Sequence, residues 1–233
     1  MRVECVWEHN GNDTLLYAAN LPGAYARGES KGIALSKMEQ EVQSYLKWAG
    51  KSVPEEICID IIQDAACGLD IRDADSDVLF ETEKQSLSEG EYTNLKALVL
   101  KSAGDFQAIY ESIPDPDQSS ALSRRTFYGY VPRTAREMYT HTKNVNAYYF
   151  GEIGVDADNE GTILESRSRG FQSLEQKPDF LHNEIVEGSY CESWNVRKML
   201  RRFLWHDRIH AKAMYRLALR EFGPDQVINP FCF

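Results

Sequence analysis

Two histidines lie one helical turn apart in the last thirty residues of the sequence. His206 and His210 are four positions apart, so on an α-helix both rings project from one face. A third histidine, His141, lies in a separate amphipathic segment. Three neutral imidazoles from two helices leave coordination positions of a divalent ion open to water or substrate, as in catalytic metal sites. The sequence therefore predicts a metal site at these three residues. The alternative is a set of core histidines that hydrogen-bond carbonyls or carboxylates.

Two amphipathic helices are expected to carry these side chains. The first runs over about residues 134–153, and Gly154 marks its end. The second runs over about residues 194–221, with Ser193 as its N-cap and Gly223-Pro224 as its stop. In both segments the histidines lie on the same helix face as the apolar residues, so we expect all three rings to point into the core.

The residues around these histidines resemble a known family, the DinB/YfiT-like metal-binding four-helix bundles. The resemblance covers about residues 87–223. It is carried by Met138-Tyr139-Thr140-His141 with the following residues to Tyr149, and by Ser193 to Leu200 leading into His206-Asp207-Arg208-Ile209-His210. All three positions that hold the metal in the family are histidines in this sequence.

The resemblance implies an up-and-down bundle in which three histidines hold a divalent metal, most often zinc or nickel, with manganese or iron as alternatives. Characterised relatives include transferases and isomerases that use low-molecular-weight thiols. We therefore expect a metal-dependent hydrolase or thiol S-transferase that acts on a small-molecule substrate. Because a metal ligand must be unprotonated, affinity is expected to fall below about pH 6.5, the ordinary histidine pKa. Glu137, Tyr139 and Asp207 are candidates for hydrogen bonds to the ligand rings.

The first part of the sequence has a different pattern, with short alternating segments around one helix. A hairpin is expected over residues 2–8 and 14–19, because Asn10-Gly11-Asn12-Asp13 is a strong turn signal. A short extended segment follows at 24–27, and Glu29-Ser30 opens a helix that runs to about residue 46. Another strand is expected at 57–62 and a fifth at Val78–Glu81. The fold class is therefore α+β, with a domain at residues 1–84 and a helical domain at 85–233.

This β-β-β-α-β order resembles the HicB-like antitoxin fold over about residues 1–63. The carriers are Leu21-Pro22-Gly23, the short strand Ala24-Tyr25-Ala26-Arg27, and Gly28-Glu29-Ser30 before the helix. HicB proteins neutralise a small RNA-cleaving toxin and often carry a DNA-binding segment, which this sequence lacks, so antitoxin activity is not expected. The rival function is a noncatalytic regulatory protein whose HicB-like domain binds a protein partner. Homodimerisation is compatible with both functions.

Four further segments have simpler interpretations. Residues 86–91 cap a helix that continues to about Glu111, and a third bundle helix is expected near Phe171–Glu187. Asp70–Asp77 is expected to be a solvated linker rather than a calcium loop, because it lacks the glycine and terminal glutamate of an EF-hand. The basic residues of 197–202 are expected on a solvated helix face, with an anion-binding patch as the alternative.

Composition excludes several other kinds of site and partner. The net charge of −10 argues against a nonspecific nucleic-acid surface. No apolar run approaches the length that spans a bilayer, and the start lacks a signal-peptide pattern, so a cytoplasmic location is expected. The five cysteines have no CxxC spacing and are expected to be reduced thiols rather than metal ligands. His9 and His182 are expected to be exposed and unrelated to the site.

Overall fold

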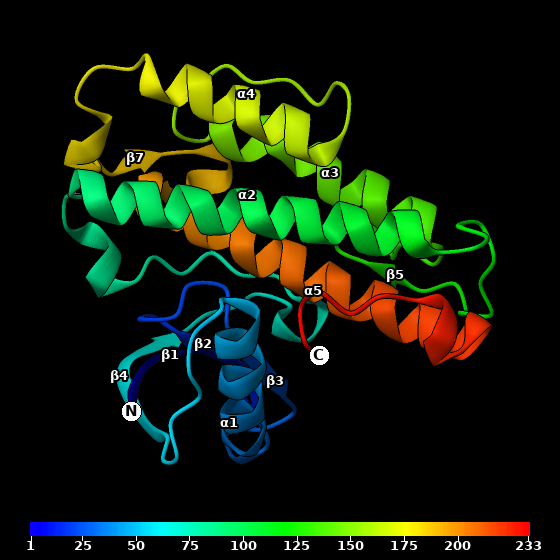
Figure 1. The fold of residues 1–233 in the computed structure, drawn as a ribbon. Helices are drawn as coiled ribbons and strands as arrows, with labels where there is room; N and C mark the ends of the chain where they lie inside the picture. The colour runs from blue at the N-terminus through cyan, green and yellow to red at the C-terminus, as the bar shows by residue number, and fades with distance from the viewer. The chain divides into compact units, whose positions relative to one another are not determined.

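In the computed structural model, which describes residues 1–233, the N-terminal alternation forms the expected hairpin. Strand β1 (Arg2–Asn10) pairs antiparallel with β2 (Asp13–Ala18), and β2 pairs with β3 (Tyr25–Gly28). Strand β4 (Cys58–Ala66) lies parallel to β1, with a bulge opposite Cys5 and Val6. The sheet order is β3-β2-β1-β4, so β4 is an edge strand (Figure 1).

Helix α1 (Lys31–Trp48) packs on this sheet. Its N-cap is Ser30, whose side chain accepts a hydrogen bond from the backbone N–H of Ile33. The buried stripe contains Ala34, Met38 and Val42, as the 3.6-residue period predicts. The β-β-β-α-β order expected for the first part of the chain is therefore present.

The segment after β4 differs from its prediction in two respects. No strand forms at Val78–Glu81, because side chains bind its backbone: the Glu81 N–H donates to Gln63 Oε1, and the Phe80 N–H donates to Glu83 Oε2. Asp70–Asp77 is not a solvated linker, since Ile71 and Ser76 are buried. The backbone N–H groups of Asp77 and Val78 both donate to the buried carboxylate of Glu8.

Two compact units result, one formed by Met1–Lys84 with Phe231–Phe233 and the other by Gln85–Pro230. The last three residues thus belong to the first unit rather than to the helical one. The Phe231 ring stacks on Trp48 of α1 with 5.4 Å between centroids, and the Ser44 hydroxyl donates to the Phe231 carbonyl. Phe231 is fully buried in this position.

Four helices form the second unit: α2 (Glu89–Ser112), α3 (Ala135–Gly151), α4 (Ile163–Glu175) and α5 (Val196–Phe222). Helices α2 and α3 each pack against both α4 and α5, so the apolar faces meet in one core. Capping boxes begin three of the helices, through Ser88 and Glu91, Thr134 and Glu137, and Thr162 and Glu165. The helix predicted up to about Glu111 and the helix predicted at 134–153 are confirmed.

The other two helices start at different residues from those predicted. The third helix lies at Ile163–Glu175 and not at Phe171–Glu187, because the Thr162 capping box starts it and it ends before Pro178. Its Gly170 packs so closely on Phe150 of α3 that an added Cβ would lie 2.1 Å from the ring. The last helix is capped by Asn195, since Ser193–Trp194 forms the short strand β8 instead of the first turn.

Short elements occur in the segments outside the long helices and the main sheet. They are the strands β5 (Arg125–Thr126), β6 (Gly129–Tyr130), β7 (Val186–Glu187) and β8, and the 3₁₀ turns η1 (Ile71–Asp73), η2 (Glu81–Lys84), η3 (Phe180–His182), η4 (Ser189–Cys191) and η5 (Pro224–Gln226). Strand β5 pairs with β6 and β7 with β8, giving two small hairpin-like sheets.

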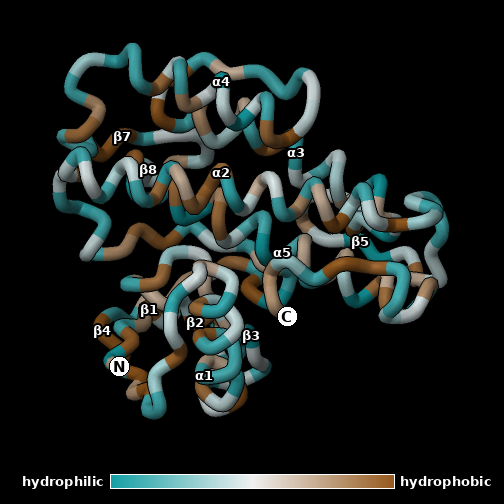
Figure 2. Tube along the Cα trace, in the orientation of Figure 1, coloured by the Kyte–Doolittle hydropathy of each residue, from teal (hydrophilic) through white to brown (hydrophobic).

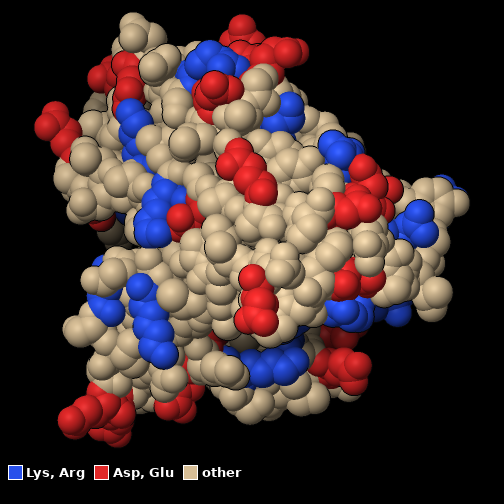
Figure 3. All heavy atoms as spheres, turned by 45° about the vertical axis from the view of Figure 1, so that its right-hand side comes forward, with Lys and Arg blue, Asp and Glu red and all other residues tan.

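The polarity of the chain is mixed along every helix. Figure 2 shows apolar and polar residues alternating along the helices of the second unit. None of the helices combines the length and the apolar character needed to cross a lipid bilayer. Figure 3 shows basic and acidic side chains interspersed over the visible face.

Candidate metal centre

Helix α5 holds two of the candidate ligands on its buried side. The Asn195 side chain accepts from the Lys198 N–H at 2.9 Å, which fixes the first turn, and Gly223 ends the helix with a φ of +83°. His206 and His210 follow on the face that packs against α3. His206 is only 8% exposed, and His210 is half-buried.

Helix α3 supplies the third ring. Thr134 and Glu137 form its capping box, and His141 lies two turns beyond Thr134. Met138, Thr142 and Tyr149 are buried on the same helix, so His141 stands at the margin of the packed face and is half-buried. The structure therefore places each of the three predicted residues on the helix expected for it.

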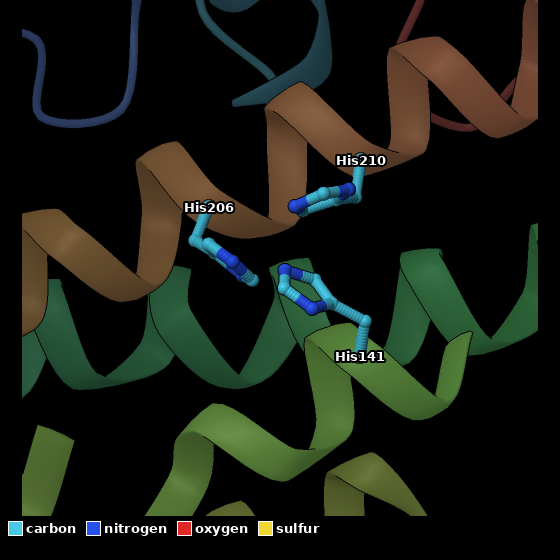
Figure 4. Close-up of side chains that lie close together, drawn as sticks. All are labelled: His141, His206 and His210. Atoms are coloured by element: carbon cyan, nitrogen blue, oxygen red, sulfur yellow. The ribbon is translucent and has the colours of Figure 1, made fainter. Parts of the chain in front are cut away.

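The three rings point toward one another across the α3–α5 interface (Figure 4). One possible ligand atom from each of His141, His206 and His210 lies within 4.8 Å of the other two. Ring centroids are 5.2 Å apart for His141 and His206, 4.7 Å for His141 and His210, and 4.4 Å for His206 and His210. Nitrogens bound to one tetrahedral zinc ion lie about 3.4 Å apart. To hold one ion, the three rings must therefore turn toward a common centre.

The electrostatics of the cluster favour neutral imidazole, the form that binds a metal. Burial lowers the pKa of His141. Burial and the neighbouring His141 lower the pKa of His210 to about 3. Burial, followed by His210 and His141, lowers the pKa of His206 well below its ordinary value. The rings are therefore unprotonated at neutral pH.

One nitrogen of the cluster is a buried polar atom without a hydrogen-bond partner, His206 Nδ1. A buried polar group that is left unsatisfied costs about 1–3 kcal/mol. A carboxylate or carbonyl bonded to this ring would support the interpretation of His206 as an ordinary core histidine, but Nδ1 has neither. The donor set and this orphaned atom fit a cation with nitrogen ligands.

The three residues expected to orient the ligand rings have other partners. Glu137 accepts from the backbone N–H groups of Arg133 and Thr134, and the Tyr139 hydroxyl accepts from the Ile163 N–H. Asp207 is fully buried, but its partner is Arg167 of α4 at 3.3 Å. None of these contacts involves a histidine ring. Aromatic rings surround the cluster instead, with Tyr149 5.9 Å from His206 and Tyr128 5.7 Å from His141.

A buried polar network behind the histidines was not predicted. Arg167 pairs with Asp207, donates from Nε to Asn146 Oδ1 at 3.1 Å, and lies over the Phe203 ring at 3.7 Å. Asn146 in turn donates to the carbonyls of Asp158 and Ser166. The one sequence signal for this network is Arg167, which falls on the apolar side of its helix. That signal can be read only when the helix is placed at Ile163–Glu175.

The basic cluster at 197–202 is not a solvated helix face. Lys198 and Arg201 are buried, and Lys198 Nζ pairs with Glu192 at 2.9 Å and donates to the Ser193 carbonyl at 2.7 Å. Burial lowers the pKa of Lys198 to about 8. Arg197 donates to the carbonyls of Gln85 and Ser86. These cations bind the surrounding loops.

The remaining histidines and the cysteines lie away from the cluster. His182 is exposed, as predicted. His9 is half-buried rather than exposed, because it stacks on Trp7 and pairs with Asp64 at 2.8 Å. All five cysteines are free thiols, and none belongs to the histidine cluster.

Comparison with protein-family models, curated proteins and solved structures finds no match to this chain.

Proposed function

We propose that this chain is a metal-dependent enzyme with a DinB-like four-helix bundle, in which His141, His206 and His210 hold a divalent cation. The observation that carries the proposal is the convergence of three neutral imidazoles from α3 and α5, with ligand atoms within 4.8 Å of one another. The unpartnered Nδ1 of His206 supports the proposal, because coordination to a cation would give this buried nitrogen a partner.

Zinc or nickel is the proposed metal, with manganese or iron as alternatives. Imidazole nitrogen suits zinc, nickel and iron, whereas magnesium and calcium prefer oxygen ligands. The cluster contains no carboxylate and no thiolate. The proposed reaction is hydrolysis or thiol S-transfer on a small molecule. A divalent ion in a three-ligand site lowers the pKa of a coordinated water or thiol and polarises a substrate carbonyl.

The side chains around the cluster have separate parts in this proposal. The three rings supply uncharged donors, since burial keeps them unprotonated. Tyr149 and the packed face of α5 exclude water from the inner side of His206. His141 and Tyr128 lie on the more open side, where a substrate would enter.

Elemental analysis of protein purified without a histidine tag tests the metal site. The wild-type chain is expected to hold about one divalent ion, and His141→Ala, His206→Ala and His210→Ala are each expected to weaken binding by about tenfold or more. The exposed His182→Ala is the matched control and should leave the metal content unchanged. Circular dichroism of each variant separates loss of metal from loss of fold.

Two results would overturn the proposal. One is a wild-type chain that binds no zinc, nickel, manganese or iron at neutral pH under reducing conditions. The other is a metal content that stays at the wild-type level in all three cluster variants, as it does in His182→Ala.

For the first unit we propose a HicB-like module. The β-β-β-α-β order and the parallel β1–β4 pairing support it. Strand β4 favours a role in binding a protein partner, because it is a nine-residue edge strand without a fully buried residue. A stoichiometric partner recovered with both wild type and His141→Ala would indicate that this role is independent of the metal site.

A further inference from the structure

A cluster of exposed aromatic side chains lies beside the histidines. The β5–β6 hairpin carries Phe127, Tyr128 and Tyr130, which are 56%, 41% and 73% exposed. Phe127 and Tyr128 contact each other edge to face, with centroids 5.0 Å apart. Tyr128 also lies 5.7 Å from the His141 ring. Large aromatic groups gathered on one exposed hairpin are typical of a binding surface.

The hairpin borders a surface hollow of about 690 Å³. Tyr130 and Arg133 line it on the hairpin side, and Thr140, His141 and Asn144 line it on the side of α3. His141 is thus shared by the histidine cluster and the hollow. A molecule in the hollow would lie against the open side of the proposed metal site.

Arg133 supplies the one cation of the hollow whose side chain has no acidic partner. The other ionisable side chains of the hollow are His141, Tyr130, Arg136 and Glu137. Arg136 is neutralised by Asp117 at 2.8 Å, and Glu137 accepts two backbone N–H groups at the start of α3. The Arg133 guanidinium is exposed and has no ion pair or hydrogen bond. A free guanidinium binds carboxylate, phosphate and similar oxyanions through two parallel N–H donors.

We propose that this hollow is the substrate-binding site and that it takes an aromatic organic anion. Arg133 pairs with the anionic group, Tyr130 contacts the apolar rings, and the rest of the molecule lies beside His141. The assignment of the hollow as a substrate site rests on the proposed function. Anion binding in the hollow does not depend on the metal. The substrate class is therefore a small molecule with both an aromatic part and a carboxylate, sulfonate or phosphate group.

The test uses two fluorescent probes on the full-length chain after metal removal by a chelator. One is 8-anilinonaphthalene-1-sulfonate, and the other is N-phenyl-1-naphthylamine, which has the same rings without the sulfonate. Arg133→Gln is expected to weaken binding of the sulfonate about fivefold and to leave the neutral probe unchanged. Arg125→Gln removes the same charge from the neighbouring β5–β6 hairpin outside the hollow, and should change neither affinity by more than about twofold.

Two further variants test the walls of the hollow. Tyr130→Ser is expected to weaken both probes about threefold, because it removes an aromatic contact. His141→Ala should weaken both probes, whereas His182→Ala should not. Equal effects of Arg133→Gln and Arg125→Gln on the sulfonate would overturn the proposal. So would a dimer in analytical ultracentrifugation that Tyr130→Ser dissociates, because the aromatic hairpin would then be an interface between copies.

These measurements separate this inference from the proposed function. Probe binding is measured without metal, so a chain that binds the sulfonate through Arg133 but holds no cation contradicts the metal proposal alone. A chain that holds a cation through its three histidines but binds the sulfonate independently of Arg133 contradicts the anion site alone.

Discussion

At the scale of the residue, burial determines the chemistry of the three histidines. An isolated exposed imidazole is half-protonated near pH 6.5. Within the cluster, desolvation and the neighbouring rings favour the neutral form, and the pKa of His210 falls to about 3. The expectation that metal affinity falls below about pH 6.5 used the ordinary value. The lowered pKa values move that fall to a more acidic range.

The pH dependence of zinc binding follows from the sign of these shifts. A proton competes with the metal only when the pH approaches the pKa of the folded, metal-free ring. Because all three pKa values are lowered, zinc affinity should change less than about threefold between pH 7.0 and pH 6.0. Competition with a chelating dye, corrected for the dye's own protonation, measures this. A steep fall that begins at pH 6.5 would contradict the buried, unprotonated cluster.

At the scale of the element, a buried ion pair holds α4 against α5. Arg167 and Asp207 are both fully buried and lie 3.3 Å apart, and Asp207 directly follows His206 in the sequence of α5. Removing one partner of such a pair leaves an uncompensated charge, whereas replacing both with apolar residues is often neutral. The pair therefore links α4 to α5 next to His206, and its contribution to stability depends on both partners being present.

Asp207→Leu should lower the free energy of unfolding by about 3–5 kcal/mol, because it leaves Arg167 buried and unpaired. The double variant Arg167→Met with Asp207→Leu should recover most of that loss. Urea denaturation followed by circular dichroism measures both. If the double variant is no more stable than Asp207→Leu, the cost comes from packing around the substituted side chain on α5 rather than from the unpaired arginine.

At the scale of the whole molecule, each unit has its own core, but the chain visits the first unit twice. Met1–Lys84 builds the sheet and α1, and Phe231–Phe233 adds a buried ring that stacks on Trp48. A residue near the end of the sequence therefore completes a core that begins at Val3. The chemistry of the histidine cluster stays within the second unit.

Phe231→Ala should destabilise the first unit by about 3 kcal/mol, the usual cost of removing a buried phenylalanine ring. Hydrogen exchange read by mass spectrometry should show faster exchange in peptides from α1, with little change in peptides from α5. Cys232→Ser changes an exposed neighbour and is the control. Equal protection of α1 in wild type and Phe231→Ala would show that the ring contributes little to this core.

Local signals explain which elements were predictable. The turn at Asn10–Asp13 and the capping residues at 86–91 act within a few residues, so they indicate the hairpin and the helix α2 correctly. The 3.6-residue spacing of the apolar side chains at 134–153 indicates α3. The prediction of a third helix near Phe171–Glu187 is wrong, because the Thr162 capping box starts the helix earlier. Ser193 has the type of an N-cap, but pairing of β8 with β7 moved the cap to Asn195.

The sequence by itself determined that the fold is α+β, that His206 and His210 share a helix face, and that His141 lies on a second amphipathic helix. Periodicity and capping are local properties, so the chain alone carries them. Only the tertiary structure decided that the three rings converge, that Asp207 pairs with Arg167, and that Lys198 and Arg201 are buried. Those outcomes depend on which helix faces pack together. The packing joins side chains that lie far apart in the sequence, and no local pattern encodes the distance between them.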